Sequence, residues 1–334
     1  MNHQIKRIGV LTSGGDAPGM NAAVRAVVRT ATSMGIECIG IRRGWSGLIN
    51  GDFLPLNSSS VSHIINKGGT MLYTARSKEF MTPEGRERAI GTCKLLGLDG
   101  IVAIGGDGTF RGALALSRQV AETGQELSVV GIPATIDNDI GCSDYTIGFD
   151  TACNTALECI DKLRDTMQSH ERCSVVEVMG RHAGWLALAV GIAAGAAAVL
   201  IPEQELNFEA DVVEPIRRAR LAGTTHYMVV VAEGAGSAFD IAKRIQDEMG
   251  IDPRVTVLGH IQRGGIPSSR DRETASLMGY NAVQALLAGK GNRIIATRDG
   301  DVVDLDMEEA LAMHKPFDMD RYHVLRALTN SDFY

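Results

Sequence analysis

The chain lacks the features that mark several broad classes of protein. It has no excess of basic residues, since its net charge is −7, which argues against a nucleic-acid-binding protein with a broad basic face. Its six cysteines are scattered: no two form a Cys-x-x-Cys pair, and none lies near a histidine pair at zinc-site spacing. Reduced thiols in an enzyme of the cytoplasm explain this pattern better than disulfides or a metal centre.

Long hydrophobic segments are also missing. The most apolar run, residues 184–202, is mostly Ala and Gly and is short of the roughly 20 residues that cross a bilayer. We predict a buried helix there, followed by a strand at 198–201, and no membrane partner. The N-terminus enters a predicted strand at once, so we expect no signal peptide and a cytoplasmic location. Gly-x-Ser-x-Gly, His-Glu-x-x-His and Walker A patterns are absent too.

Prolines are few, 9 against 38 glycines, which favours tight strand–helix turns over disorder. Short apolar segments alternate with helical patterns, and such strands joined by amphipathic helices imply parallel sheets covered on both faces. The predicted fold class is therefore α/β. The predicted strands are residues 7–12, 37–42, 100–104, 128–132, 174–179, 198–201, 227–232 and 254–259. Two predicted helices bury one face each, made by Met20, Ala23, Val24, Val27 and Val28 and by Ala113, Leu116 and Val120.

Two glycine turns follow predicted strands and each contains an acid. The apolar segment 101–104 runs into Gly-Gly-Asp-Gly-Thr at 105–109, and segment 8–12 runs into a similar turn at 13–19. Glycines leave room for a ligand, and a helix N-terminus attracts anions. Asp107 would repel a bare phosphate, but Mg²⁺ between them resolves the conflict. The turn at 105–109 thus predicts a Mg-nucleotide site. Two such turns could face one cleft, although ordinary strand–helix turns remain an alternative.

The segment Thr-Ile-Asp-Asn-Asp at 135–139 places two carboxylates and an amide directly after a buried strand. A carboxylate beside a reacting hydroxyl can act as a general base. In phosphoryl transfer, positioning and charge neutralisation do most of the remaining work. An Asx-turn cap uses the same residue types, and these local features favour neither interpretation.

Cations gather late in the chain. They flank the predicted strands 174–179 and 254–259 and comprise Arg172, Arg181, His182, Arg254, His260, Arg263, Arg270 and Arg272. Arginine binds phosphate with a fixed fork of donors. In an acidic protein this group suits a phosphorylated small substrate. Each cation alone could be solvated surface, but the glycines of 259–265 allow close approach to a ligand.

These segments together resemble the bacterial type of ATP-dependent 6-phosphofructokinase, nearly end to end. The resemblance rests on 9–21, 105–109, 135–139, 179–181 and 258–265. The turn at 105–109 is shared with lipid and NAD kinases, whereas 135–139 and 259–265 are far more specific. The resemblance implies two interleaved three-layer α/β/α lobes with mostly parallel sheets. The larger, ATP-binding lobe would be 1–145 plus 259–310, and the smaller, sugar-phosphate-binding lobe 146–258 plus 311–334.

The resemblance also implies the reaction, a glycolytic phosphoryl transfer from Mg-ATP to the 1-hydroxyl of fructose 6-phosphate. Asp137 would be the base, with Thr135, Arg181 and Asp139 steadying the phosphoryl group. ATP would be held by Gly15, Arg76, Ser77, Gly106, Asp107, Gly108 and Thr109, with Asp107 on Mg²⁺. The sugar phosphate would contact Thr135, Ile136, Asp137, Met179, Gly180, Arg181, Glu233, His260, Ile261, Gln262 and Arg263. Arg172 and Arg254 would reach it from a neighbouring subunit of a homotetramer.

Departures from the family pattern refine these expectations. Gly108 and Ala134 stand where pyrophosphate-dependent relatives carry Asp and Lys, so ATP is the expected donor, although Ala134 replaces the usual glycine. Met81 replaces an arginine near the nucleotide. At the allosteric effector pocket Arg25, Arg164 and Gly195 match. Basic residues are replaced by Ser58, Thr224 and Thr225, and an acid by Ala197, so we expect ADP activation to be weak or absent.

Three functions are compatible with these residues. The first is the ATP-dependent kinase. The second is a relative that uses pyrophosphate or another phosphorylated ketose, such as tagatose 6-phosphate. The third is a non-catalytic regulatory subunit. That subunit should have lost the base or the metal-binding acid, and the sequence retains both Asp137 and Asp107.

Overall fold

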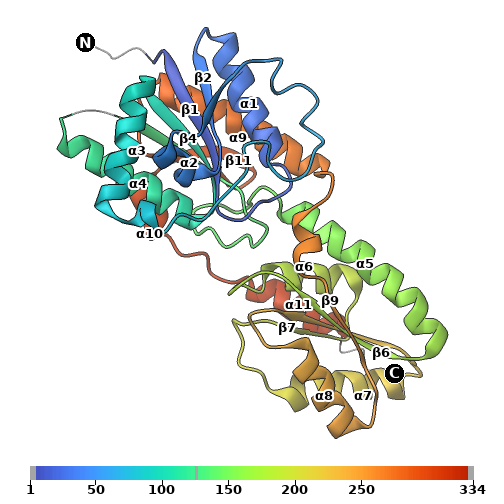
Figure 1. Cartoon of the computed structure of the whole chain (residues 1–334). Coiled ribbons are helices and arrows are strands. Elements are labelled where there is room, and N and C mark those ends of the chain that lie inside the picture. The colour runs from blue at the N-terminus through green and yellow to red at the C-terminus, as the bar shows by residue number, and fades with distance from the viewer. Residues whose placement is uncertain (1–4, 125–126, 330–334) are drawn as a thin grey trace. The chain divides into compact units, whose positions relative to one another are not determined.

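The computed structural model describes residues 5–124 and 127–329. The chain divides into two compact units that are interleaved in the sequence (Figure 1). The first comprises 1–135, 140–150 and 263–315, and the second 136–139, 151–262 and 316–334. Residues 1–4, 125–126 and 330–334 of these ranges and of the expected lobes lie outside the described residues. The chain passes back to the first unit after residue 262 and returns to the second after residue 315. The expected lobes placed these two changes after residues 258 and 310.

A seven-stranded sheet forms the centre of the first unit, in the order β11-β10-β5-β4-β1-β2-β3. Five neighbouring strands are parallel, and the edge strands β3 and β11 run antiparallel. The strands are β1 (Arg7–Ser13), β2 (Glu37–Ile41), β3 (Phe53–Leu56), β4 (Gly100–Gly105), β5 (Ser128–Pro133), β10 (Arg293–Arg298) and β11 (Asp301–Asp306).

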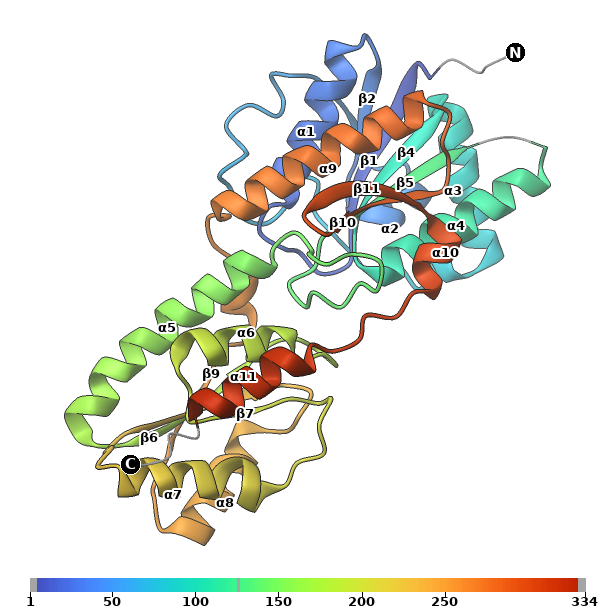
Figure 2. The same ribbon diagram turned by 180° about the vertical axis from the view of Figure 1, so that it is seen from behind.

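Helices cover both faces of this sheet (Figures 1 and 2). On one face α1 (Met20–Ser33) packs against α9 (Ser269–Leu287). The other face carries α2 (Gly44–Asn50), α3 (Pro83–Leu96), α4 (Asp107–Glu122) and α10 (Met307–Ala312). Alternate residues of a strand point to opposite faces. Ile101 and Ala103 join the core beneath α2–α4, while Val102 and Ile104 are equally buried. Both faces therefore need apolar residues, which explains the non-alternating sequence of β4.

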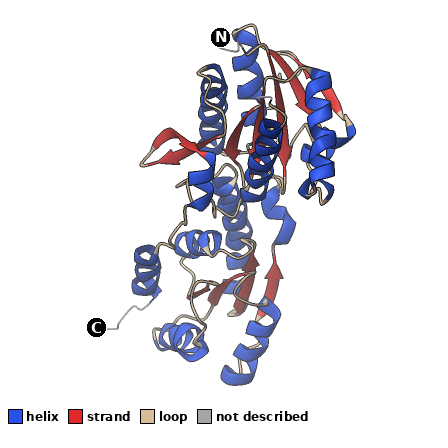
Figure 3. Cartoon of the chain, turned by 90° about the vertical axis from the view of Figure 1, so that its left-hand side faces the viewer, coloured by secondary structure: helices blue, strands red, loops and turns tan. Residues whose placement is uncertain are grey.

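The second unit has a smaller, fully parallel sheet in the order β7-β8-β6-β9. Its strands are β6 (Cys173–Val178), β7 (Ala198–Leu200), β8 (Tyr227–Ala232) and β9 (Arg254–Val257). Helices α6 (Trp185–Ala194) and α11 (Met319–Thr329) pack together on one face, and α7 (Glu214–Leu221) and α8 (Ala238–Met249) lie on the other. The long helix α5 (Phe149–His170) leads into this unit. In Figure 3 most strands of each unit lie between helices, as the predicted α/β/α layers require.

Most sequence-based elements are confirmed. All eight predicted strands exist with ends within two residues, and the two predicted helix faces are buried. The apolar run at 184–202 is helix α6 followed by β7, as predicted. Within the described residues, no helix combines the length and the apolar character needed to cross a membrane.

Three strands were not predicted. Strands β10 and β11 form a hairpin whose two-residue loop, Asp299-Gly300, has φ of +53° and +89°. Such positive angles suit Asp-Gly and match the twist of a hairpin, so this dipeptide was a signal that could have been used. Strand β3 contains Pro55, which is tolerated because β3 is an edge strand.

The cysteines are free thiols, as expected. Burial raises the pKa of Cys38, Cys93 and Cys173 to about 12 and that of Cys142 to about 11. The thiolate is the reactive form, so we expect a pulse of iodoacetamide at pH 8 to modify only the partly exposed Cys153 and Cys159 of the folded protein. The other four should react after denaturation in guanidinium. Peptide mass spectrometry would contradict this if Cys38 reacted as fast as Cys159.

Candidate active site

In the first unit the loops after β1, β4 and β5 lie side by side. Ser13, the last residue of β1, pairs with Gly105 at the end of β4, and Gly105 pairs with Pro133 at the end of β5. The chain leaves β1 toward β2 on one side of the sheet, whereas β4 and β5 lie on the other. Such a reversal at the carboxyl edge is where open α/β sheets bind ligands. The sheet thus brings both glycine turns and the start of segment 135–139 to one edge.

The turn after β4 opens helix α4 at Asp107. The Thr109 hydroxyl donates to the Ser13 carbonyl at 3.1 Å, which ties this turn to the end of β1. The Asp107 carboxylate accepts a hydrogen bond from Arg111 Nε at 2.6 Å, one helical turn later. Their side chains are 48% and 61% exposed, so this ion pair is weak. Arg111 was not predicted, although its i, i+4 spacing from Asp107 was visible in the sequence.

Space for a ligand is open beside this turn. A Cβ atom built at Gly108 has no described atom within 4 Å. At Gly106 the same atom would lie 4.0 Å from the Thr135 Cβ, and no other atom of the described residues is recorded within that distance. A Cβ at Gly15 would approach Arg263 Nη1 to 2.6 Å. That guanidinium donates to the Asp16 carbonyl at 3.1 Å, so Arg263 lies against the turn after β1.

The predicted nucleotide residues Arg76 and Ser77 lie on a segment that hydrogen bonds fix to the same turn. The Thr74 hydroxyl donates to the Gly14 carbonyl at 2.7 Å. Ser77 Oγ accepts from the Phe80 N–H at 3.2 Å, while the Arg76 side chain is exposed. Met81, which replaces the arginine of the family pattern, is 71% exposed.

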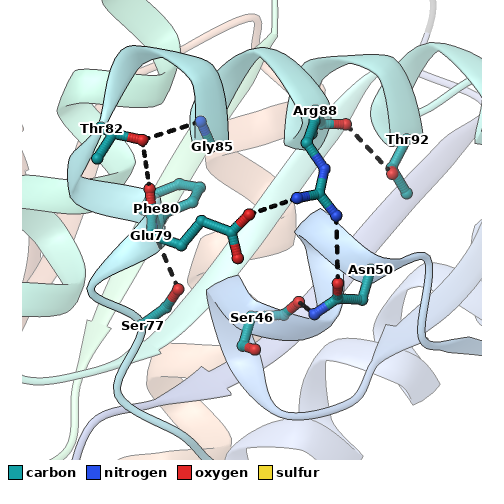
Figure 4. A network of polar contacts seen from close by, with 9 residues as sticks. All are labelled: Ser46, Asn50, Ser77, Glu79, Phe80, Thr82, Gly85, Arg88 and Thr92. Carbon is teal, nitrogen blue, oxygen red and sulfur yellow. Dashed lines mark hydrogen bonds and ion pairs between the residues drawn. The ribbon is translucent and has the colours of Figure 1, made fainter.

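Figure 4 shows what holds this segment on helices α2 and α3. Glu79 forms an ion pair with Arg88 of α3, and Arg88 also reaches Asn50 of α2. Thr82 caps α3 by accepting from the Gly85 N–H at 3.1 Å. Beneath these residues the rings of Trp45 and Phe80 stack with centroids 4.6 Å apart. The position of Ser77 therefore depends on contacts with α2 and α3, which the residues next to it in the sequence did not reveal.

The segment 135–139 begins at the end of β5. The Ala134 N–H donates to the Gly105 carbonyl at 2.9 Å, and the Thr146 hydroxyl to the Thr135 carbonyl at 2.6 Å. Ile136, predicted to contact the sugar phosphate, is fully buried, so this structure exposes no surface of it to a substrate. In the second unit Asp137 is 7% exposed, whereas Asp139 is exposed. Between them Asn138 has φ of +53°, a left-handed conformation that Asn tolerates better than most residues.

A second set of predicted residues meets at the carboxyl edge of the second unit's sheet. Gly180 and Arg181 follow β6 with φ of +140° and +58°. Glu233 follows β8, and its Oε1 accepts from the Gly180 and Arg181 N–H groups at 3.2 and 2.6 Å. Glu233, predicted to contact the sugar, therefore also holds the strained turn that presents Arg181.

The segment after β9 joins this edge. Gln262 is fully buried, and its Oε1 accepts from the Met179 N–H at 2.8 Å. Among the described residues its Nε2 has no hydrogen-bond partner. His260 and Ile261 are exposed in the short 3₁₀-helix Gly259–Arg263. The structure thus brings Met179, Gly180, Arg181, Glu233 and Gln262 together.

Arg172 and Arg254 lie at the opposite end of the same sheet. Arg172 precedes β6, and Arg254 pairs with Ser174 near the start of that strand. Ser174 and Val178 are separated by four residue steps of about 3.3 Å, or about 13 Å along the strand. The side chains of Arg172 and Arg254 are exposed, and Arg254 forms an ion pair with Asp252 at 3.2 Å. Within one unit these arginines are therefore far from Met179–Arg181.

The predicted effector residues fall in two places. Arg164 and Gly195 line a cavity of about 270 Å³ in the second unit, with Ala197 and Thr224 in the same wall. The Arg164 guanidinium donates to the Ala194 carbonyl at the end of α6. Most other lining residues are apolar, including Met167, Leu325 and Leu328. Arg25 and Ser58 belong to the first unit.

Comparison with known proteins gives a consistent result. The family model described as Phosphofructokinase matches residues 7–286. ATP-dependent 6-phosphofructokinases of Clostridium botulinum and Clostridium novyi are each 50% identical over 325 residues, 97% of this chain and 100% of theirs. Phosphofructokinase from Saccharomyces cerevisiae superposes with a TM-score of 0.86 at 36% identity. The superposition covers 97% of this chain but 47% of the yeast chain, so this chain spans about half of that protein.

A pyrophosphate-dependent phosphofructokinase from Marinobacter aquaeolei has a TM-score of 0.84 at 24% identity, covering 99% of this chain and 93% of that chain. At this identity the likeness shows the shared fold alone. The fold, the full-length relatives and the family match agree, and the chain belongs to the phosphofructokinase family.

Proposed function

We propose that this protein is an ATP-dependent 6-phosphofructokinase of glycolysis. It transfers the γ-phosphoryl group of ATP to the 1-hydroxyl of fructose 6-phosphate and releases fructose 1,6-bisphosphate and ADP. The observation that carries the proposal is the 50% identity over 97% of the chain to enzymes with this name. The geometry supports it, since Asp107, the acid proposed to hold Mg²⁺, and a buried carboxylate follow neighbouring strands β4 and β5. We place the reaction in the cytoplasm.

In this proposal the turns after β1 and β4 bind ATP. The first N–H groups of α4 and the open space at Gly108 suit phosphate oxygens. Asp107 would hold Mg²⁺. No cluster of three or more potential protein ligands occurs among residues 5–124 and 127–329. A single carboxylate fits Mg²⁺ that takes its other ligands from water and phosphate. When bound, the ion neutralises charge on the transferring group.

Asp137 acts as the general base in this proposal. A carboxylate that accepts the proton of the sugar 1-hydroxyl raises the nucleophilicity of that oxygen as it attacks phosphorus. Asp137 is largely excluded from solvent and Asp139 is exposed. This difference supports a proton-transfer role for the first and a role in orienting charge for the second. Arg181 would then steady the transferring phosphoryl group.

A paired initial-rate assay tests the proposal. Fructose 6-phosphate is supplied with Mg-ATP or with Mg-pyrophosphate, and fructose 1,6-bisphosphate is measured through aldolase coupling. We expect turnover with ATP and at most a trace with pyrophosphate. Faster turnover with pyrophosphate would overturn the donor assignment. Faster turnover of tagatose 6-phosphate would overturn the assigned acceptor.

We further propose a homotetramer in which subunits share active sites. The position of Arg172 and Arg254, at the opposite end of the sheet from Met179–Arg181, supports this. Arg254→Ala should raise the KM for fructose 6-phosphate at least about tenfold, since a hydrogen bond to a charged group contributes roughly 1.5–3 kcal/mol. The KM for ATP should change little. Arg244→Ala, whose guanidinium pairs with Glu248, is the control, and an unchanged KM in Arg254→Ala would contradict the assignment.

Regulation by ADP should be weak. The cavity that contains Arg164 and Gly195 offers mostly apolar walls, and Thr224 and Thr225 replace cations of the family's effector pocket. Each lost contact to a phosphate removes about 1 kcal/mol or more of binding. We expect the fructose 6-phosphate saturation curve to stay within about twofold in half-saturation when ADP is added at fixed ATP. A strong leftward shift would refute this.

A further inference from the structure

A buried carboxylate near the start of α9 contacts a loop far away in the sequence, within the first unit. Asp271 has no exposed surface. Its Oδ1 accepts from the Tyr145 hydroxyl at 2.5 Å and from the Gly148 N–H at 2.6 Å. The other oxygen, Oδ2, accepts from the Ser268 hydroxyl at 3.5 Å. None of these residues belongs to the set assigned above to ATP, sugar phosphate or metal.

Asp271 is surrounded by hydrogen-bond donors and lies at the start of a helix. Ser268 caps α9 and accepts from the Asp271 N–H at 3.3 Å, so the carboxylate lies in the first turn, where the helix dipole favours it. Burial, and next the Asp271 charge, raise the pKa of the Tyr145 phenol far above its usual range. Tyr145 therefore remains a donor at every working pH. The Arg270 guanidinium covers its ring at 4.2 Å.

The loop held by Asp271 is bonded directly to the end of β5. The Thr146 hydroxyl donates to the Thr135 carbonyl at 2.6 Å, and the Ile147 N–H to the Pro133 carbonyl at 3.1 Å. Ala134 and Ile147 form a parallel bridge. Loop 145–148 thus lies beside 133–135 like a short additional strand. Thr135 is a proposed catalytic residue, and the proposed base follows it by two positions in the sequence.

The same loop packs against the turn after β1. A Cβ at Gly148 would lie 2.6 Å from the Ala17 Cβ. At Gly19 it would lie 2.6 Å from Ile147 Cγ2 and 3.5 Å from the Asp271 Cβ. Both glycines have φ near +100°, at +103° and +105°, so side chains are excluded by space and by backbone angle. Asp271 therefore lies where the turn after β1 and the segment after β5 approach each other.

We propose that Asp271 and Tyr145 are positioning residues for phosphoryl transfer. They hold loop 145–148, and the loop in turn fixes Thr135 relative to the turns after β1 and β4. This inference rests on the proposed kinase function. A shift of about 1 Å at a reacting group can lower a rate by roughly 100-fold, so the loss of one distant hydrogen bond should reduce kcat without removing a substrate contact.

The test compares four variants with the wild-type full-length protein, using Mg-ATP and fructose 6-phosphate. Tyr145→Phe removes the hydroxyl that Asp271 holds. Thr146→Val removes the bond to Thr135, and Thr146→Ser keeps it. Tyr322→Phe removes the hydroxyl of another buried tyrosine, in the second unit and outside the assigned site. We measure kcat, both KM values and the thermal midpoint.

We expect Tyr145→Phe and Thr146→Val each to lower kcat about tenfold or more while both KM values stay within about twofold. Thr146→Ser should retain most of the wild-type kcat, and Tyr322→Phe all of it. Thermal midpoints should fall by only a few degrees, alike in Tyr145→Phe and Tyr322→Phe.

Two results would overturn the inference. One is a kcat in Tyr145→Phe equal to that of Tyr322→Phe. The other is an equal loss of kcat in Thr146→Ser and Thr146→Val, because the hydroxyl retained in the serine variant would then not contribute to catalysis. Wild-type protein that fails to phosphorylate fructose 6-phosphate would instead overturn the proposed function, and this inference with it.

Discussion

Asp137→Asn should lower kcat by about 10³-fold, within the roughly 10²–10⁴-fold that a positioned general base contributes. Asparagine has nearly the same shape but cannot accept the proton of the sugar hydroxyl. Because the loss falls on the transition state, the affinities for Mg-ATP and fructose 6-phosphate should remain near wild type. Steady-state kinetics together with calorimetric titration of both substrates would measure this separation.

The matched control is Asp304→Asn, which removes a carboxylate from β11 in the first unit. Asp304 pairs with Lys290 and Arg293. Its amide variant should be slightly less stable but should turn over normally. Near-normal turnover in Asp137→Asn would refute the assignment of the base. Equal loss in both variants would show that the effect comes from a general loss of structure.

Gly108→Asp should lower kcat/KM for ATP by about 100-fold or more. Two negative charges about 4 Å apart at an effective dielectric constant near 20 repel by about 4 kcal/mol, and the new carboxylate would lie beside the polyphosphate. The folded protein should tolerate the change, since a Cβ at Gly108 meets no described atom within 4 Å. Unchanged thermal stability with lost ATP turnover would therefore assign the effect to the ligand.

Gly108→Ala separates the two causes. It adds volume without charge, so its loss should be much smaller than that of Gly108→Asp if repulsion dominates. Equal losses would indicate a steric limit on the nucleotide. Wild-type kinetics with ATP in Gly108→Asp would show that this position does not face the donor.

The sequence predicts those parts of the fold and site that depend on neighbouring residues. The apolar strands, the helix faces and the turn at 105–109 are all local patterns. The hairpin β10–β11 was missed although Asp299-Gly300 signalled it, because each strand has only three apolar residues and begins and ends with a charged one. The supports of the site are not local. Glu233 holds a turn 53 positions earlier, and Tyr145 meets Asp271 across 126 positions.

The register of the strands shows how far apart the arginines lie, which their spacing along the sequence could not show. Arg254 follows Arg181 in a cationic group when read along the chain, but the pairing of Arg254 with Ser174 separates them by the length of β6. The same residue types therefore occur at two ends of one sheet, and only the sheet shows which arginines can share a phosphate within one subunit.

That separation has a consequence at the level of the gene. If each site takes its base from one subunit and two arginines from another, a chain lacking Asp137 can still lend Arg172 and Arg254 to a neighbour. A chain lacking Arg254 can still lend its Asp137. Two alleles that are each impaired alone would then complement each other when co-expressed, because mixed assemblies contain some sites with no defect. In that case the effect of a mutation depends on which residues meet at a subunit contact, and not on one chain alone.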